Sequence, residues 1–168
     1  MKKWIYGIIL IICICVGGFC AYQAWQIYNE DNEVELQTDK LKKECVEKKN
    51  ENGEQILSPD WGSLKAINPD IVGWIYVPDC AISYPVVQAT NNSYYLDHTF
   101  YKGYNYMGSA FLDCNTNRDF SDDNNIIYGH SVQGGGMFTL LKNFSSKSFF
   151  DSHPVFYLLT PEQNYKCN

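Results

Sequence analysis

The feature that most constrains this chain is an uncharged, apolar stretch near its N-terminus. It runs from Trp4 to Tyr28 and reads WIYGIILIICICVGGFCAYQAWQIY. As a helix rising about 1.5 Å per residue, a stretch of this length spans the hydrocarbon core of a bilayer, which is about 30 Å thick. Aromatic residues stand at both of its ends, as they do at membrane interfaces. We therefore predict that residues 1–28 form a cytoplasmic tip and a single transmembrane helix.

The charges on the two sides of this stretch predict its orientation. Lys2 and Lys3 precede it, and an acidic segment containing Glu30 and Glu33 follows it. Basic residues stay on the cytoplasmic side, so we expect a single-pass protein of the cell membrane with its N-terminus in the cytoplasm and its domain outside the cell. The alternative is a cleaved signal peptide. The stretch is longer than the apolar region of such a peptide, and Phe19 before Cys20 makes a poor cleavage site.

Composition and cysteine spacing exclude several classes of protein. The net charge of -6 argues against a nucleic-acid partner, because phosphate contacts require a clustered basic face. Three of the seven cysteines lie in the apolar stretch, where they act as small hydrophobic residues. The other four are single, with no spacing typical of a metal site. We expect no metal and no cofactor, while a disulfide between two single cysteines stays open.

The remaining chain divides into a polar segment and a folded domain. Residues 29–54 are rich in Glu, Lys, Asn and Gln, and Val34, Leu41 and Cys45 fall on one helical face. We predict a solvated helical stalk that ends at Gly53, with a disordered linker as the alternative. Residues 55–168 form the domain. It opens with a short helix for which Ser58 is the predicted N-cap and Pro59 the first helical residue.

The domain is predicted to be mostly β. Short apolar segments alternate with turn residues, which favours antiparallel strands in a sandwich or barrel. Two short helices are predicted in GMFTLLKNF and SKSFFDSH. The predicted strands are IVGWIYVP, AISYPVVQ, GSAFLD, NNIIYGH, VFYLLT and NYKCN.

His130 is the first candidate for chemistry. It ends the NNIIYGH segment and precedes the glycine loop Gly134–Gly136. Histidine titrates near neutral pH and serves as a general acid or base. The alternative is a structural histidine whose ring binds a backbone carbonyl. Cys80 and Cys114 are weaker candidates for a nucleophile, because a reactive thiol needs a nearby base or positive charge and neither cysteine has a local sequence signature of one.

The ordered segments GWIYVP, YPVVQ, YYL, GSAFLD, IIYGH and the following MF helix together resemble class B sortases. The resemblance runs from about Asp60 to the last residue and implies a sortase-like β-barrel, incomplete at the C-terminus. It also implies a cysteine transpeptidase that cleaves an NPQTN-type sorting signal and joins surface proteins to an amine of a cell-wall precursor. By resemblance, His130 is the catalytic histidine, and Tyr128, Leu96 and Asn92 line the substrate groove.

Two elements of the family's site have no match in this sequence. No TLSTC-like segment supplies a nucleophile, and Cys167 stands in a segment that precedes the nucleophile's strand in the family. The only arginine, Arg118, comes before His130, whereas the family's arginine follows it. We therefore expect a partial, truncated sortase domain that is inactive as it stands. The alternatives are a non-catalytic membrane-anchored binding module and a His/Asp metal hydrolase.

Overall fold

The computed structural model describes residues 2–51, 54–132 and 135–168. Gly53, where the stalk was predicted to end, and Gly134 of the glycine loop lie outside the described residues. The helices are α1 (Lys2–Cys45), α2 (Trp61–Ile67), η1 (Tyr94–Leu96), η2 (Thr139–Ser145) and α3 (Lys147–Ser152), of which η1 and η2 are 3₁₀ helices. The strands are β1 (Val46–Glu51), β2 (Glu54–Pro59), β3 (Ile71–Tyr76), β4 (Ser83–Val87), β5 (Ala110–Leu112), β6 (Ile127–Tyr128), β7 (Phe156–Leu159) and β8 (Asn164–Cys167).

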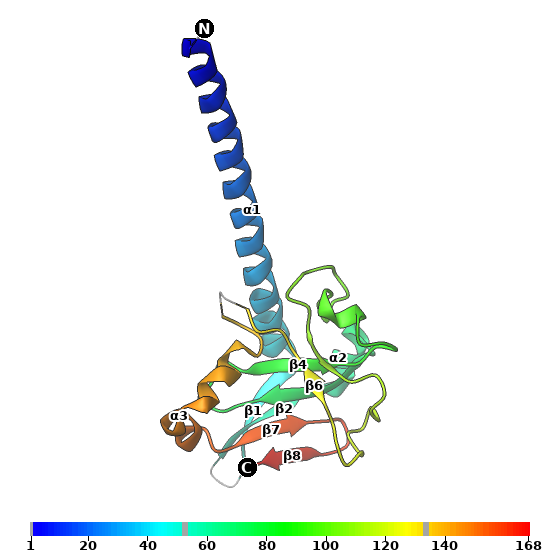
Figure 1. Cartoon of the computed structure of the whole chain (residues 1–168). Coiled ribbons are helices and arrows are strands. Elements are labelled where there is room, and N and C mark those ends of the chain that lie inside the picture. The colour runs from blue at the N-terminus through cyan, green and yellow to red at the C-terminus, as the bar shows by residue number, and fades with distance from the viewer. Residues whose placement is uncertain (1, 52–53, 133–134) are drawn as a thin grey trace.

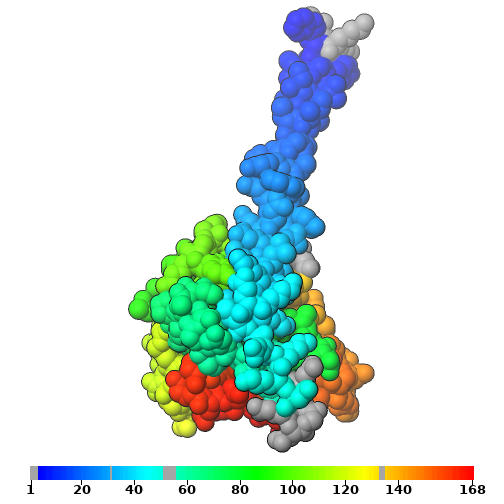
Figure 2. All heavy atoms as spheres, turned by 180° about the vertical axis from the view of Figure 1, so that it is seen from behind, coloured from blue at the N-terminus to red at the C-terminus, as the bar shows by residue number. Residues whose placement is uncertain are grey.

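The long helix α1 has two parts with different surroundings. Its upper turns project from the domain, as Figure 1 shows, and their apolar side chains are exposed. Among the described residues, α1 is the one helix long and apolar enough to cross a membrane. Its lower turns lie against the domain (Figure 2). There Val34, Leu41 and Cys45 are buried, with exposed fractions of 3%, 0% and 6%. The prediction of a solvated stalk is therefore wrong for this part of the helix.

The chain after Cys45 forms a β-hairpin instead of continuing as a helix. Strand β1 pairs antiparallel with β2, from Val46 opposite Pro59 to Glu51 opposite Glu54. This pairing buries Leu57 in the same core cluster as Leu41, and tertiary contacts of this kind override the helix propensity of Glu and Lys. The predicted helical segment to residue 54 is therefore wrong from Val46 onward.

The start of α2 also differs from the prediction. Ser58 and Pro59 belong to β2, and the N-cap is Asp60. The Asp60 carboxylate accepts hydrogen bonds from the backbone N–H groups of Gly62 at 3.0 Å and Ser63 at 3.2 Å. It therefore satisfies two of the amide donors that a helix start leaves without a partner.

The main sheet confirms the mostly-β prediction. It has six strands in the order β6-β5-β4-β3-β7-β8, and each of the six predicted strand segments contributes one of them. All neighbouring strands are antiparallel except β4 and β5, which are parallel. A parallel pair needs a long connection, and here the connection includes η1 and the loop of residues 97–109.

The sheet curls around an apolar interior that stays open between its two edges. Trp74 of β3 is fully buried, and its indole N–H donates to the Ser83 hydroxyl at 3.1 Å. The edge strands β6 and β8 both line one cavity of about 650 Å³, through Ile127, Tyr165 and Cys167. The sheet is thus a half-open barrel with short helices, as predicted.

Candidate active site around His130

The backbone of His130 is held by the start of η2. His130 lies two residues beyond the end of β6. Its carbonyl accepts the N–H of Phe138 at 3.0 Å. The Phe138 ring covers Gly129, because a Cβ added to Gly129 would lie 2.6 Å from Phe138 Cδ2. The glycine before the histidine is therefore required by this close approach, and the approach fixes where the imidazole leaves the backbone.

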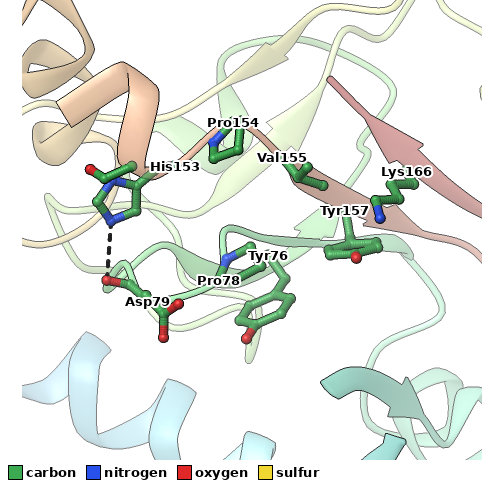
Figure 3. Close-up of a pocket in the computed structure, with 9 residues that line it drawn as sticks. Tyr76, Pro78, Asp79, His153, Pro154, Val155, Tyr157 and Lys166 are labelled. Carbon is green, nitrogen blue, oxygen red and sulfur yellow. Dashed lines mark hydrogen bonds between the residues drawn. The ribbon is translucent and has the colours of Figure 1, made fainter. Parts of the chain in front are cut away.

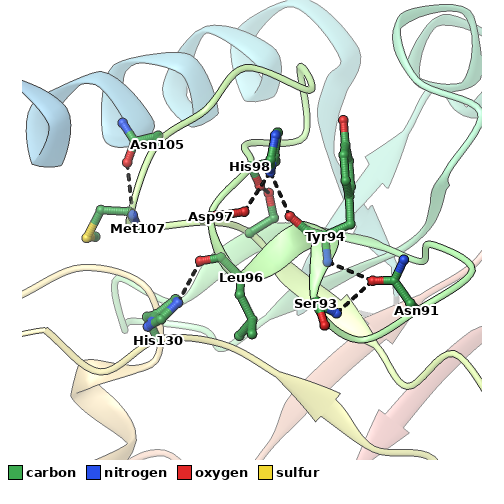
Figure 4. A network of polar contacts seen from close by, with 10 residues as sticks. Asn91, Ser93, Tyr94, Leu96, Asp97, His98, Asn105, Met107 and His130 are labelled. Atoms are coloured by element: carbon green, nitrogen blue, oxygen red, sulfur yellow. Dashed lines mark hydrogen bonds and ion pairs between the residues drawn. The ribbon is translucent and has the colours of Figure 1, made fainter.

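The imidazole of His130 is oriented by one backbone carbonyl. Its Nε2 lies 2.8 Å from the oxygen of Leu96, and Figure 4 shows the two facing each other. A carbonyl oxygen only accepts, so Nε2 carries the proton and Nδ1 is the basic nitrogen. No hydrogen bond to Nδ1 is found within the described part of the chain. His130 is only partly buried, so this ring is both bound by a carbonyl and available for proton transfer.

Leu96 contributes to the site through its backbone as well as its side chain. It ends η1, and its side chain is 45% exposed. Gly108 lies directly against its carbonyl, where an added Cβ would be 2.6 Å from Leu96 O. Gly108 also has a φ of +58°, which favours glycine. The sequence predicted only a groove-lining role for Leu96, because a carbonyl contact has no signature in residue type.

Asn92 and Tyr128 meet at Asp113. The Asn92 side chain donates to Asp113 Oδ2 at 2.8 Å, and the Tyr128 hydroxyl donates to the same oxygen at 3.0 Å. Asn92 Oδ1 in turn accepts the backbone N–H of Cys114 at 2.8 Å. The structure thus brings together two of the predicted groove residues, on a carboxylate that was not predicted to contact them.

Asp113 could have been found from strand pairing. It directly follows β5, and its N–H donates to the carbonyl of Ile126, just before β6. The backbone N–H of Asn115, followed by Asn92 and Tyr128, holds the pKa of Asp113 below its ordinary value. Asp113 is therefore a carboxylate at neutral pH and an acceptor for both groove residues.

The cysteines and the arginine occupy other places. All seven cysteines are unpaired, and no hydrogen bond within the described residues joins one of them to His130. Cys167 lies on β8, the opposite edge strand from β6, and burial raises the pKa of its thiol. The Arg118 guanidinium donates to the carbonyls of Pro69 at 3.0 Å and Gln88 at 3.3 Å. Arg118 therefore links its own loop to the segment just before β3 and to the residue that follows β4.

The other two histidines have hydrogen-bond partners of their own. His98 Nδ1 is 2.7 Å from Asp97 Oδ1 and 2.9 Å from the Tyr94 carbonyl. His153 lines a pocket of about 310 Å³ (Figure 3), where its Nε2 is 3.3 Å from the carbonyl of Asp79, and it also lines the cavity of about 650 Å³. In residues 2–51, 54–132 and 135–168, no three His, Cys, Asp or Glu side chains are grouped to hold a metal ion.

Two curated proteins are similar to this chain. It is 37% identical over 117 residues to sortase B of Listeria monocytogenes, an alignment that covers 70% of this chain and 47% of that protein. It is 32% identical over 157 residues to sortase B of Staphylococcus aureus, covering 92% of this chain and 63% of that protein. No protein-family profile matches the chain.

Solved structures of similar proteins share the fold. Sortase B of Bacillus anthracis in complex with AAEK1 has a TM-score of 0.70 and 30% identity, over 84% of this chain and 66% of that chain. A class B sortase of Streptococcus pyogenes involved in pilus biogenesis has a TM-score of 0.61 and 38% identity, over 64% and 60%. The chain thus spans about half to two thirds of the length of the proteins that it matches.

Proposed function

Because the chain belongs to the class B sortase family, we propose that its function is sortase-type cysteine transpeptidation at a membrane surface. The proposed substrate is an NPQTN-type sorting signal of a surface protein. The proposed acceptor is an amine on a cell-wall precursor. The observation that carries the proposal is the His130–Leu96 hydrogen bond, which leaves Nδ1 of a partly exposed imidazole as the basic nitrogen.

The proposed chemistry uses Nδ1 of His130 in both halves of the reaction. A cysteine thiolate attacks the carbonyl carbon of the signal's threonine, and the protonated Nδ1 gives its proton to the departing amine. The neutral Nδ1 then takes a proton from the acceptor amine as this amine attacks the thioester and displaces the cysteine thiolate, which restores the starting pair of thiolate and protonated imidazole. Throughout, Leu96 holds the opposite nitrogen, so the ring need not reorient between the two steps.

We assign the predicted groove residues to substrate contact in this proposal. Asn92 and Tyr128 are held in place by the Asp113 carboxylate, and the exposed side chain of Leu96 lies beside the imidazole. Tyr128 is itself partly exposed. A preordered polar pair next to an apolar side chain suits an extended peptide that carries both amide and aliphatic groups.

The same proposal places the protein in the cell membrane. The apolar part of α1 is long enough to span a bilayer. Lys2 and Lys3 before it, and the acidic residues after it, favour a cytoplasmic N-terminus with the folded domain outside the cell. There the domain would meet both proposed substrates.

We propose that these 168 residues by themselves bind the sorting signal without cutting it. No cysteine of the described residues forms a hydrogen bond with His130. Arg118 is committed to two backbone carbonyls. This second candidate function is a membrane-anchored binding module with the peptide groove of a sortase.

One experiment separates the two candidates. The full chain in lipid nanodiscs is incubated with a fluorescent NPQTN-type peptide and an amine acceptor, and both binding and cleavage are measured. Cleavage that is lost in His130→Ala supports transpeptidation by these residues, whereas binding without cleavage supports the module. His153→Ala is the matched control, because His153 lines two pockets to which His130 does not contribute. Absence of binding and of cleavage would contradict both candidates.

A further inference from the structure

The lower part of α1 is connected to the imidazole of His130 by several hydrogen bonds and one close packing contact. Asn105 is 1% exposed, and its side-chain N–H donates to the carbonyl of Glu30 in α1 at 2.9 Å. Its side-chain oxygen accepts the N–H of Met107 at 2.9 Å. Figure 4 shows Asn105 beside the helix and Met107 on the same loop. Asn105 therefore fastens the loop of residues 97–109 to α1.

This loop in turn places the acceptor of His130. The backbone of Asn105 donates to the Asp97 carbonyl and accepts from the N–H of Gly108, both at 2.9 Å. Gly108 packs against the carbonyl of Leu96, the atom that binds His130 Nε2 at 2.8 Å. The loop residues on both sides of Asn105 thus converge on the carbonyl that fixes the ring.

A second set of contacts runs from α1 to the backbone of His130. Val34 of α1 packs in one buried cluster with Met137 and Phe138, and the N–H of Phe138 binds the His130 carbonyl. In the same region, Glu35 Oε1 lies 2.8 Å from where a Cβ on Gly136 would stand.

Glu35 also accepts a hydrogen bond from the buried Tyr84 hydroxyl at 3.4 Å. Burial, and then the Glu35 carboxylate, raise the pKa of Tyr84, so this hydroxyl remains a donor. The carboxylate therefore links α1 to the interior of the sheet beside the segment that follows the glycine loop.

We propose that the lower part of α1, from Glu30 to Cys45, is a positioning element of the active site and that Asn105 is its positioning residue. The helix is uninterrupted from Lys2 to Cys45, so the segment that would enter the membrane and the segment that orients His130 move as one body. An effect of α1 on catalysis rests on the acid–base role proposed for His130. The orientation of the His130 ring by α1 does not depend on that role.

The test reads the state of the imidazole instead of activity. The full chain in nanodiscs is labelled with ¹⁵N-histidine, and its three histidines are observed by NMR at about pH 9, where free histidine is neutral. Two substitutions are compared with the wild type. Asn105→Ala removes both side-chain bonds, whereas Asn105→Asp keeps the acceptor for Met107 and removes the donor to Glu30. The control is Tyr104→Ser in the same loop, where the side chain is 70% exposed.

In both Asn105 variants we expect the ratio of the Nε2–H to the Nδ1–H tautomer of His130 to fall about fivefold, the effect of losing one ordinary hydrogen bond. His153 should keep its wild-type resonances, which shows that the fold is intact. Tyr104→Ser should leave His130 unchanged. An unchanged His130 in a folded Asn105→Asp overturns the proposal, even when Asn105→Ala shifts it, because the bond to α1 is then irrelevant.

If the Asn105 variants do not fold, the proposal is tested with Val34→Thr and Glu35→Ala. These substitutions weaken the second set of contacts, which joins α1 to the segment around Phe138. Amide exchange of Phe138 should then rise about tenfold while that of the buried strand β4 stays constant. Wild-type exchange at Phe138 in both variants overturns the proposal. Neither measurement depends on peptide cleavage, so a failure of the proposed function would leave this result standing.

Discussion

At the scale of single residues, this site depends on where a few backbone atoms lie. His130 is held at its carbonyl by Phe138 and at its ring by the carbonyl of Leu96. A glycine lies beside each of these two contacts: Gly129 packs against the ring of Phe138, and Gly108 packs against the carbonyl of Leu96. Glycine is required because no other residue lets two segments approach this closely. The imidazole of His130 is the group that can transfer a proton, and the two glycines allow the close contacts that orient it.

Gly108→Ala should therefore cost stability and disturb the site. The added Cβ would lie 2.6 Å from Leu96 O on a backbone with φ of +58°, and we expect unfolding to become easier by about 1–3 kcal/mol. Gly103→Ala is the matched control in the same loop, because its Cβ would stand 3.9 Å from the nearest side-chain atom. It should change the free energy of unfolding by less than about 0.5 kcal/mol. Denaturant titration of both variants measures the difference, and equal costs would contradict this reading of the loop.

Asp113 predicts a dependence of stability on pH. Hydrogen bonds from Asn115, Asn92 and Tyr128 hold the pKa of Asp113 below its ordinary 3.8 in the folded state. Its stabilising contribution is therefore complete above the unfolded pKa and is lost as the pH falls through the folded pKa. We expect the stability difference between wild type and Asp113→Asn to be largest near neutral pH and to shrink below about pH 4. A difference that grows on acidification would show that Asp113 does not accept these bonds.

At the scale of elements, α1 is both a candidate membrane span and a part of the domain. Its lower turns place Val34, Leu41 and Cys45 on one buried face, at the spacing of helical turns. Leu41 and Cys45 belong to a cluster with Trp74 and Leu159 of the main sheet. The hairpin of β1 and β2 then continues this contact. The helix therefore cannot swing freely on the domain, as a solvated stalk would.

Leu41→Ala tests this packing directly. Leu41 is fully buried, so its truncation should lower the free energy of unfolding of the domain by about 2–5 kcal/mol. Leu36→Ala is the control on the same helix. Its side chain is 69% exposed, and its removal should cost less than about 0.5 kcal/mol. Both values come from denaturant titration of the full chain in nanodiscs. If this part of the helix were a free stalk, both substitutions would change the free energy of unfolding by equally small amounts, and that result would contradict the packing.

At the scale of the whole molecule, the six-stranded sheet has two edges that face one apolar cavity. Strands β6 and β8 are those edges, and both contribute residues to the cavity of about 650 Å³. Several large apolar side chains around it are exposed, among them Leu141, Phe150 and Phe156. Unpaired strand edges beside exposed apolar surface promote association.

The open cavity should bind an apolar fluorescent dye. Phe150 lines the cavity and is 56% exposed, so Phe150→Ser should reduce the dye signal above empty nanodiscs by at least about twofold. Tyr104→Ser, a change of similar size outside the cavity, should leave the signal unchanged. Equal losses in the two variants would indicate that the dye reports general surface and not this cavity.

The local patterns of the sequence determined a large part of this structure. The apolar stretch from Trp4 to Tyr28 predicted a helix, because internal backbone hydrogen bonds are the ones that would satisfy this segment in the bilayer that we propose for it. Short β-favouring segments between turn residues predicted all six strands of the main sheet. The IIYGH segment placed His130 beyond the end of one strand. These features follow from residues close together in the chain, where burial and propensity can be read directly.

Only the tertiary structure decided the end of α1, the parallel pairing of β4 with β5, and the partners of His130. Val46 begins a strand because a distant core accepts Leu57, which outweighs the local preference for helix. Leu96 and His130 are 34 positions apart, and Glu30 and Asn105 are 75 apart. Two of these contacts are made to backbone carbonyls, which every residue carries, so residue type gives no sign of them. They arise because the sheet topology brings the 97–109 loop between α1 and the end of β6.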